Sequence, residues 1–349
     1  MDFNAKPPSK ILELKTPPIT SYPMHAHTLS LVLRDEDEPL QWYFEYYIQL
    51  FAGKDISDAC YVDFCAPLPW KSCPWIYHQK ISRELMGKGW RSVVDFLMDA
   101  IDSGYYTFLF LDRFFLPQSV DFNKRRYPHD ILVYGYDSDE KVFYIADFGQ
   151  AGKYGRQTAH FQEIEKAFLN LDLTSVNDAL EGIILMSPTK QSGYTLSNQR
   201  ICGHINDFLS SRMPANASRE GYWADIYQNR DAWCFGMEVY SLLQEHLEQS
   251  VENPRRTDIR AFHVLVDHSK LMLLRIKYLA DHGRLNNGAA IYSDCEKLQR
   301  QTLILQNLVV KSSWTENPKL LARPIGMISE TAEMERGVLE SILQNIIIS

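Results

Sequence analysis

Residues 129–147, with the sequence HDILVYGYDSDEKVFYIAD, decide the fold of the first half of this 349-residue chain. Two runs of aliphatic, β-branched and aromatic residues, 130–136 and 141–147, flank the polar segment 137–140. Such runs on either side of a short polar turn predict a β-hairpin. Antiparallel pairing brings the two outer ends of a hairpin side by side, so His129 and Asp147 are expected within hydrogen-bonding reach.

This pair is the first candidate for catalysis. An imidazole oriented by a carboxylate is the base half of a nucleophilic triad, and His129 with Asp147 supplies both groups. The alternative is a structural pair, in which His129 hydrogen-bonds a loop. Asp130 and Asp137 are expected to be strand-end and turn residues.

The surrounding sequence predicts an α+β protein: a domain with an antiparallel sheet, followed by an all-helical domain. Residues 1–23 are rich in Pro, Lys and Thr and are expected to form an extended arm. Further strands are predicted at 105–111 and 182–186. Hydrophobic periodicity predicts helices at 26–33, 42–51, 76–86, 90–101, 163–169, 233–249, 258–282, 294–311 and 328–347. A boundary between Pro188 and Ser197 gives two predicted domains, 1–192 and 193–349.

Charge and cysteine content argue against several classes. The chain has 36 Lys and Arg against 44 Asp and Glu, a net charge of −8, and its longest basic block is Lys124–Arg126, which argues against a nucleic-acid partner. No apolar stretch is long enough to span a membrane, and residues 1–10 lack the apolar core of a signal peptide, so a cytoplasmic protein is expected. The cysteines form no CxxC pair and are expected to be reduced.

Two segments resemble a known family. The pattern of His129 to Asp137, followed by Phe143 to Asp147, resembles the His and Asp arms of papain-like peptidases that cleave bacteriocin leaders. It is more similar still to the butirosin biosynthesis protein H-like N-terminal domain, a papain-like acyltransferase domain of natural-product gene clusters. The helical segment from Arg260 to Leu279 is similar to proteins encoded beside nonribosomal peptide synthetases.

The resemblance implies a cysteine nucleophile at the N-terminus of the first core helix, where the helix dipole lowers a thiol pKa. Alignment of Leu29–Leu33 with that helix places Met24 or His25 at the nucleophile position. A thioether cannot ionise, so the chain departs from the family there. Three alternatives remain: a nucleophilic Cys65 or Cys73, a serine replacement at Ser21 or Ser30, or a site that has kept its cleft without its chemistry.

The resemblance therefore implies an acyl- or aminoacyltransferase, or an amide hydrolase, in peptide antibiotic biosynthesis. Its expected partners are an acyl or peptidyl carrier domain, or a peptide or amine substrate. The alternative is an inactive papain-like protein that binds a peptide, a small molecule or a carrier or synthetase domain. No cofactor is expected. No metal is expected either, because His25 and His27 would point to different faces of a helix. A homodimer through the polar stripe Arg260, His263, Asp267 and Lys270 is a further alternative to a solvated helix face.

Overall fold

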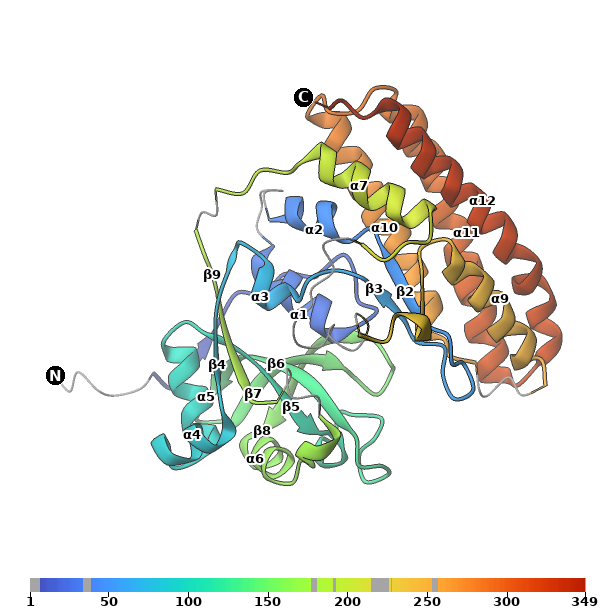
Figure 1. Cartoon of the computed structure of the whole chain (residues 1–349). Coiled ribbons are helices and arrows are strands. Elements are labelled where there is room, and N and C mark those ends of the chain that lie inside the picture. Colours follow the sequence, from blue (N-terminus) through green and yellow to red (C-terminus); the bar gives the residue numbers. More distant parts are fainter. Residues whose placement is uncertain are drawn as a thin grey trace. The chain divides into compact units, whose positions relative to one another are not determined.

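The structure is a computed structural model that divides the chain into two compact units. The first comprises residues 1–39 and 68–193, and the second residues 40–67 and 194–349. Figure 1 shows the elements of each unit along the chain. The structure describes residues 7–33, 39–176, 181–190, 193–214, 226, 228–252 and 257–348.

A mainly antiparallel sheet forms the centre of the first unit. Its strand order is β4 (Ile76–Ile81), β9 (Ile183–Pro188), β5 (Tyr106–Asp112), β6 (Pro128–Asp137), β7 (Val142–Phe148) and β8 (Tyr154–His160). The predicted hairpin is confirmed as β6 and β7, which pair antiparallel from Asp137 opposite Val142 to Leu132 opposite Ala146. His129 therefore lies near the start of β6, opposite Leu111 of β5.

Helices cover the sheet. α5 (Val93–Asp102) and α6 (Phe161–Leu169) pack on one face, where the core includes Phe96, Ile131 and Ile145. α1 (Pro23–Val32) contacts β6, β7 and β9. Because side chains alternate along a strand, Asp130 points away from the face that Ile131 occupies.

The N-terminal arm takes part in the sheet, which the sequence did not predict. β1 (Ser9–Ile11) pairs antiparallel with β6, with Ile11 opposite Gly135. A Cβ atom on Gly135 would lie 2.9 Å from the Lys10 carbonyl oxygen and 3.0 Å from the Ile11 Cα. Glycine at this position therefore permits the approach of β1 to the bulged part of β6.

The substitution Gly135→Ala tests this close approach. The added methyl group meets backbone atoms that cannot move away alone, so the free energy of unfolding should fall by about 1–3 kcal/mol. The matched control is Gly155→Ala on β8, where an added Cβ meets nothing within 4 Å and stability should change little. Urea denaturation of both variants makes the measurement, and equal stability of the two would contradict the proposed contact.

The second unit combines helices with a small antiparallel sheet, so the prediction of an all-helical domain was wrong in this respect. The sheet has the order β10 (Trp233–Phe235), β2 (Leu50–Gly53) and β3 (Val62–Phe64). The helices are α2 (Leu40–Tyr46), α7 (Asn198–Leu209), α9 (Glu238–Ser250), α10 (Arg260–Asp281), α11 (Gly288–Thr315) and α12 (Ala322–Asn345).

Residues 40–67 belong to this second unit, whereas the predicted boundary had placed them in the first. The physical reason lies in two buried side chains of α10. Arg275 is fully buried and donates to the carbonyl oxygens of Phe44 and Tyr47, at 2.6 and 2.8 Å. His268 contacts the carbonyl oxygen of Ile48 at 2.7 Å. These bonds satisfy the carbonyls at the end of α2, and they tie that segment to α10.

Several predicted elements differ from the structure. Residues 76–86 were predicted as one helix but form β4 followed by α4 (Arg83–Gly89). The predicted helix at 42–51 ends at Tyr46, and that at 233–249 starts only at Glu238, because both segments contribute strands to the small sheet. Long-range pairing decides these cases, and local periodicity does not contain it.

The polar stripe on α10 is only partly solvated, because Arg260 is exposed whereas Asp267 is buried. Asp267 is 7% exposed, and His263 Nδ1 lies 2.6 Å from the Gln306 amide nitrogen of α11. None of the helices in the described residues is long and apolar enough to cross a membrane.

Candidate functional site

The outer end of the β6–β7 hairpin carries the predicted histidine–carboxylate pair. His129 Nδ1 lies 3.3 Å from Asp147 Oδ1 and 3.0 Å from the main-chain oxygen of Asp130. The Asp147 side chain is 3% exposed and that of His129 is 15% exposed. The polar contacts of the ring within the described residues all involve Nδ1, so Nε2 makes none of them.

A buried arginine braces the carboxylate of this pair. Arg113, in the 3₁₀ turn η1 (Arg113–Phe115) after β5, lies 3.7 Å from Asp147 Oδ2 and 3.8 Å from Asp121 Oδ2. It also donates to the carbonyl oxygen of Phe148. The main-chain N–H of Phe148 in turn donates to Asp147 Oδ1 at 2.6 Å. The Asp147 carboxylate is thus contacted by His129, Arg113 and a backbone amide.

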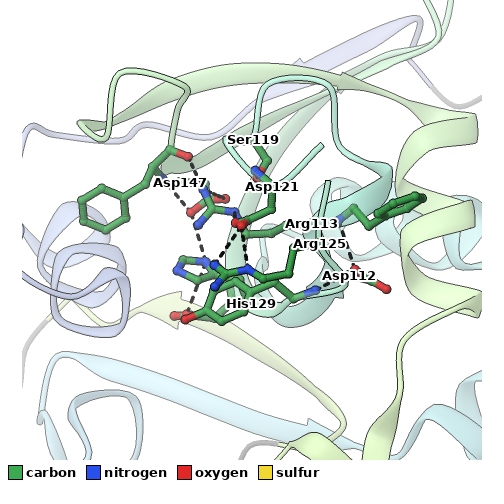
Figure 2. A network of polar contacts seen from close by, with 11 residues as sticks. Asp112, Arg113, Ser119, Asp121, Arg125, His129 and Asp147 are labelled. Carbon is green, nitrogen blue, oxygen red and sulfur yellow. Dashed lines mark hydrogen bonds and ion pairs between the residues drawn. The ribbon is translucent and has the colours of Figure 1, made fainter. Parts of the chain in front are cut away.

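Two further carboxylates order the loop that carries Arg113. Asp112 Oδ1 accepts from the backbone amides of Phe114 and Tyr127, at 3.0 and 3.1 Å. Asp121 Oδ1 accepts from Arg125 Nη2 at 2.8 Å, and its backbone amide donates to Ser119 Oγ at 3.0 Å. Figure 2 shows these side chains joined to His129 and Asp147 in one network. The loop between β5 and β6 therefore fixes the position of Arg113 and, through it, that of Asp147.

Asp130 extends this network toward α1. Its Oδ1 lies 3.8 Å from His129 Nδ1, and its Oδ2 lies 3.8 Å from Nε2 of His27 on α1. His27 Nδ1 is 2.8 Å from the hydroxyl oxygen of Tyr154 on β8. Asp130 is buried among these groups, whereas the sequence had suggested an ordinary strand-end residue. Asp137 does behave as the expected turn residue, since it accepts from the amides of Asp139 and Glu140.

Opposing effects set the protonation of these groups. Burial acts to lower the pKa of His129, but Asp147 and then Asp130 favour the imidazolium, and the net effect is a raised pKa. Burial raises the pKa of Asp130, against the opposing effect of His129. Burial lowers the pKa of His27 to about 3, so this second histidine is neutral.

None of the contacts of the His129 ring in the described part of the chain involves a cysteine. Cys73 follows α3 (Pro69–Ser72) in the first unit, and its side chain is buried. Cys65 belongs to the second unit, next to β3, and desolvation of its thiol raises its pKa to about 12. Burial also raises the pKa of Cys60 to about 12 and that of Cys234 to about 11. These three thiols are protonated and unreactive near neutral pH.

The first helix offers no thiol either. α1 begins with Pro23 and Met24, after Tyr22 at its N-cap. Ser30 is buried in the middle of this helix, and its hydroxyl donates to the carbonyl oxygen of Ala26 at 2.7 Å. Ser21 precedes the helix and is buried. No group of three or more His, Cys, Asp or Glu side chains among the described residues has an arrangement that could hold a metal ion.

The sequence did not identify Arg113, Asp121, His27 or Tyr154 as members of the cluster. Only Asp130 could have been recognised from the sequence, because a charged residue inside the apolar run of β6 needs a polar partner on the face to which it points. The other four come from separate elements, and only tertiary packing brings them to the end of the hairpin. Neither a protein-family model nor a curated protein matches this chain.

Replacement of Asp147 by Asn tests the origin of the raised His129 pKa. Without the carboxylate, burial dominates, so the pKa of His129 should fall below 6.5. In the wild-type protein the raised pKa adds stability that is complete below about pH 6.5 and is lost as pH rises through the folded-state pKa. Asp147→Asn should lack this loss.

NMR titration of the histidine Cε1–Hε1 signals, with urea unfolding at several pH values, measures both effects. The control Asp139→Asn removes an exposed carboxylate from the same hairpin and should leave the His129 titration unchanged. An unaltered His129 pKa in Asp147→Asn would refute the assignment.

Replacement of Arg113 by Gln tests how much its contacts with Asp147 and Asp121 contribute. Removal of one partner from a buried ion pair is expected to cost about 3–5 kcal/mol of stability. Because Arg113 disfavours the imidazolium, the pKa of His129 should rise further. Arg125→Gln is the matched control: its side chain is 64% exposed and contacts the same Asp121, so it should cost less than about 1 kcal/mol. Thermal unfolding of both variants compares them, and equal losses would argue against a special role for Arg113.

Proposed function

We propose that the first unit is a papain-like domain that catalyses acyl or aminoacyl transfer with His129 as a general base and without a cysteine nucleophile. The observation that carries this proposal is the His129–Asp147 pair at 3.3 Å, with the carboxylate buried and the polar contacts of the ring on Nδ1 rather than on Nε2. Asp147 favours the tautomer with the proton on Nδ1, so Nε2 presents a lone pair. A base in this state accepts a proton from an acceptor amine or from water.

The reaction that fits this arrangement is direct attack of an amine on an acyl thioester of a carrier domain. The amine nitrogen forms a bond to the carbonyl carbon while its proton moves to His129 Nε2. The carbon–sulfur bond then breaks, and the leaving thiolate takes the proton back. The products are an amide and a free thiol, and His129 returns to its starting state. Water in place of the amine gives hydrolysis. The class of substrate, peptide intermediates of antibiotic biosynthesis, follows from the family resemblance alone.

A second candidate is a papain-like protein that binds such a molecule without converting it. Two observations argue against thiol catalysis and are compatible with this candidate: Met24 lies at the start of α1, and the thiols of Cys60, Cys65 and Cys234 have raised pKa values. Both candidates agree that the cysteines are not nucleophiles. They differ in whether His129 transfers a proton.

The test uses aminoacyl and peptidyl N-acetylcysteamine thioesters, which imitate the carrier arm, with amines as acceptors and amide formation followed by mass spectrometry. His129→Gln should lower kcat/KM by about 10²–10⁴-fold, the range of a lost general base. Cys65→Ser and Cys73→Ser should leave it unchanged. His78→Gln, on β4 of the same unit, is the control for a histidine substitution.

Three other results of the thioester assay would contradict the proposal or favour the second candidate. Full activity of His129→Gln would refute general-base catalysis by this residue. Loss of activity in Cys73→Ser, with covalent acylation of Cys73, would establish a thiol mechanism instead. Binding of the thioesters without turnover by the wild-type protein would support the second candidate.

A further inference from the structure

The first helix contributes a second histidine, whose ring is held on several sides. The side chain of His27 is fully buried, its Nδ1 lies 2.8 Å from the Tyr154 hydroxyl, and its ring centroid is 5.8 Å from that of Phe108 in an edge-to-face contact. Its Nε2 faces Asp130 Oδ2 at 3.8 Å. Both atoms of this last contact are buried, and neither has a hydrogen-bond partner among the described residues.

Repulsion between the Asp130 carboxylate and a nitrogen lone pair indicates which nitrogen of His27 carries the proton. The ring is neutral, because burial lowers its pKa to about 3, so it has a single N–H. Burial raises the pKa of Tyr154, whose hydroxyl therefore keeps its proton. A lone pair on Nε2 would repel the Asp130 carboxylate across a buried gap. The arrangement without this repulsion has the proton on Nε2, while Nδ1 accepts from the Tyr154 hydroxyl.

We propose that His27 is a positioning residue: its protonated Nε2 faces Asp130, favours the ionised form of that carboxyl group and orients it beside His129. At 3.8 Å the contact is an electrostatic one rather than a hydrogen bond. Asp130 Oδ1 then lies 3.8 Å from His129 Nδ1, so the charge on Asp130 acts directly on the imidazolium. Tyr154 takes part by holding the tautomer of His27.

The groups that face Asp130 come from several elements. His129 precedes it on β6, Asp147 lies on β7 and Arg113 on η1, and each affects its charge. His27 comes from α1, and Tyr154 from β8 acts through it. Of these groups, His27 is the neutral donor, so its removal changes the polarity around Asp130 without changing the net charge. The effect on turnover rests on the proposed function, but the effect on protonation does not.

The direct measurement is the ¹⁵N chemical shift of the His27 ring nitrogens in the wild-type protein at neutral pH, which distinguishes the two tautomers. We expect the proton on Nε2. A ring protonated on Nδ1, or on both nitrogens, would overturn the proposal. This measurement needs no substrate and no variant, so it is independent of whether the protein proves to be an enzyme.

Variants then test the action on Asp130 and His129. In His27→Phe the Asp130 carboxyl, followed by ¹³C NMR, should titrate at a pH higher by roughly 0.5–1 unit, and the pKa of His129 should fall. His27→Gln, which retains an N–H donor, should restore both values most of the way. Tyr154→Phe should cause smaller shifts in the same directions, and the control His78→Gln none.

A purely structural role would lower the stability of His27→Phe without moving the two titrations. Unchanged Asp130 and His129 titrations in folded His27→Phe, or equal shifts in His27→Phe and His27→Gln, would overturn the proposal. If His27→Phe does not fold, Tyr154→Phe decides the same question, and unaltered titrations in that variant count against it. Inactivity of all forms toward thioesters would refute the proposed function and leave these results intact.

Discussion

Burial of the Asp147 carboxylate is the constraint around which the end of the β6–β7 hairpin is built. An ionised carboxylate removed from water costs several kcal/mol unless charged or hydrogen-bonding partners replace the solvent. Here His129, Arg113 and the amide of Phe148 replace it. Arg113 is itself buried, and the Asp121 carboxylate lies 3.8 Å from its Nε as a second charged neighbour. The buried carboxylate thus links the end of the hairpin to Arg113 and, through Arg113, to Asp121 in the loop between β5 and β6.

The second unit also contains a buried charged side chain, but its hydrogen-bond partners are neutral main-chain carbonyls. Arg275 is fully buried, and its guanidinium donates to main-chain carbonyls of Phe44 and Tyr47. Burial lowers its pKa to about 9, so it remains charged at neutral pH. Carbonyl oxygens at the end of a helix carry partial negative charge and are otherwise without partners. The same buried cation thus binds the carbonyls at the end of α2 and ties residues 40–67 to α10, whose Arg275 lies 231 residues after Phe44.

These two sites show why the sequence predicted some features and not others. The hairpin, and with it the proximity of His129 and Asp147, depends on neighbouring residues and a short turn, so local pattern was sufficient. Arg113, His27 and Arg275 act on groups that are far away in the sequence, and no local pattern identifies those partners. β2 and β10 likewise pair across about 180 residues. For the segments that form β2 and β10, such contacts decide the structure, and the helices predicted from the periodicity of apolar residues were wrong there.

The charges at the site bear on how His129 acts. With a neutral imidazole, the carboxylates of Asp121, Asp130 and Asp147 outnumber the guanidinium groups of Arg113 and Arg125 by one. Protonation of His129 makes the cluster neutral, in agreement with the direction of its pKa. A general base is most effective when its pKa lies near the pH at which it works, and the carboxylates raise the pKa of His129 against the effect of burial. Acyl transfer requires this property, because the base that accepts the amine proton must release it to the leaving thiolate within the same turnover. In the proposed reaction, the same excess of carboxylate would attract a substrate that carries positive charge away from its reacting neutral amine.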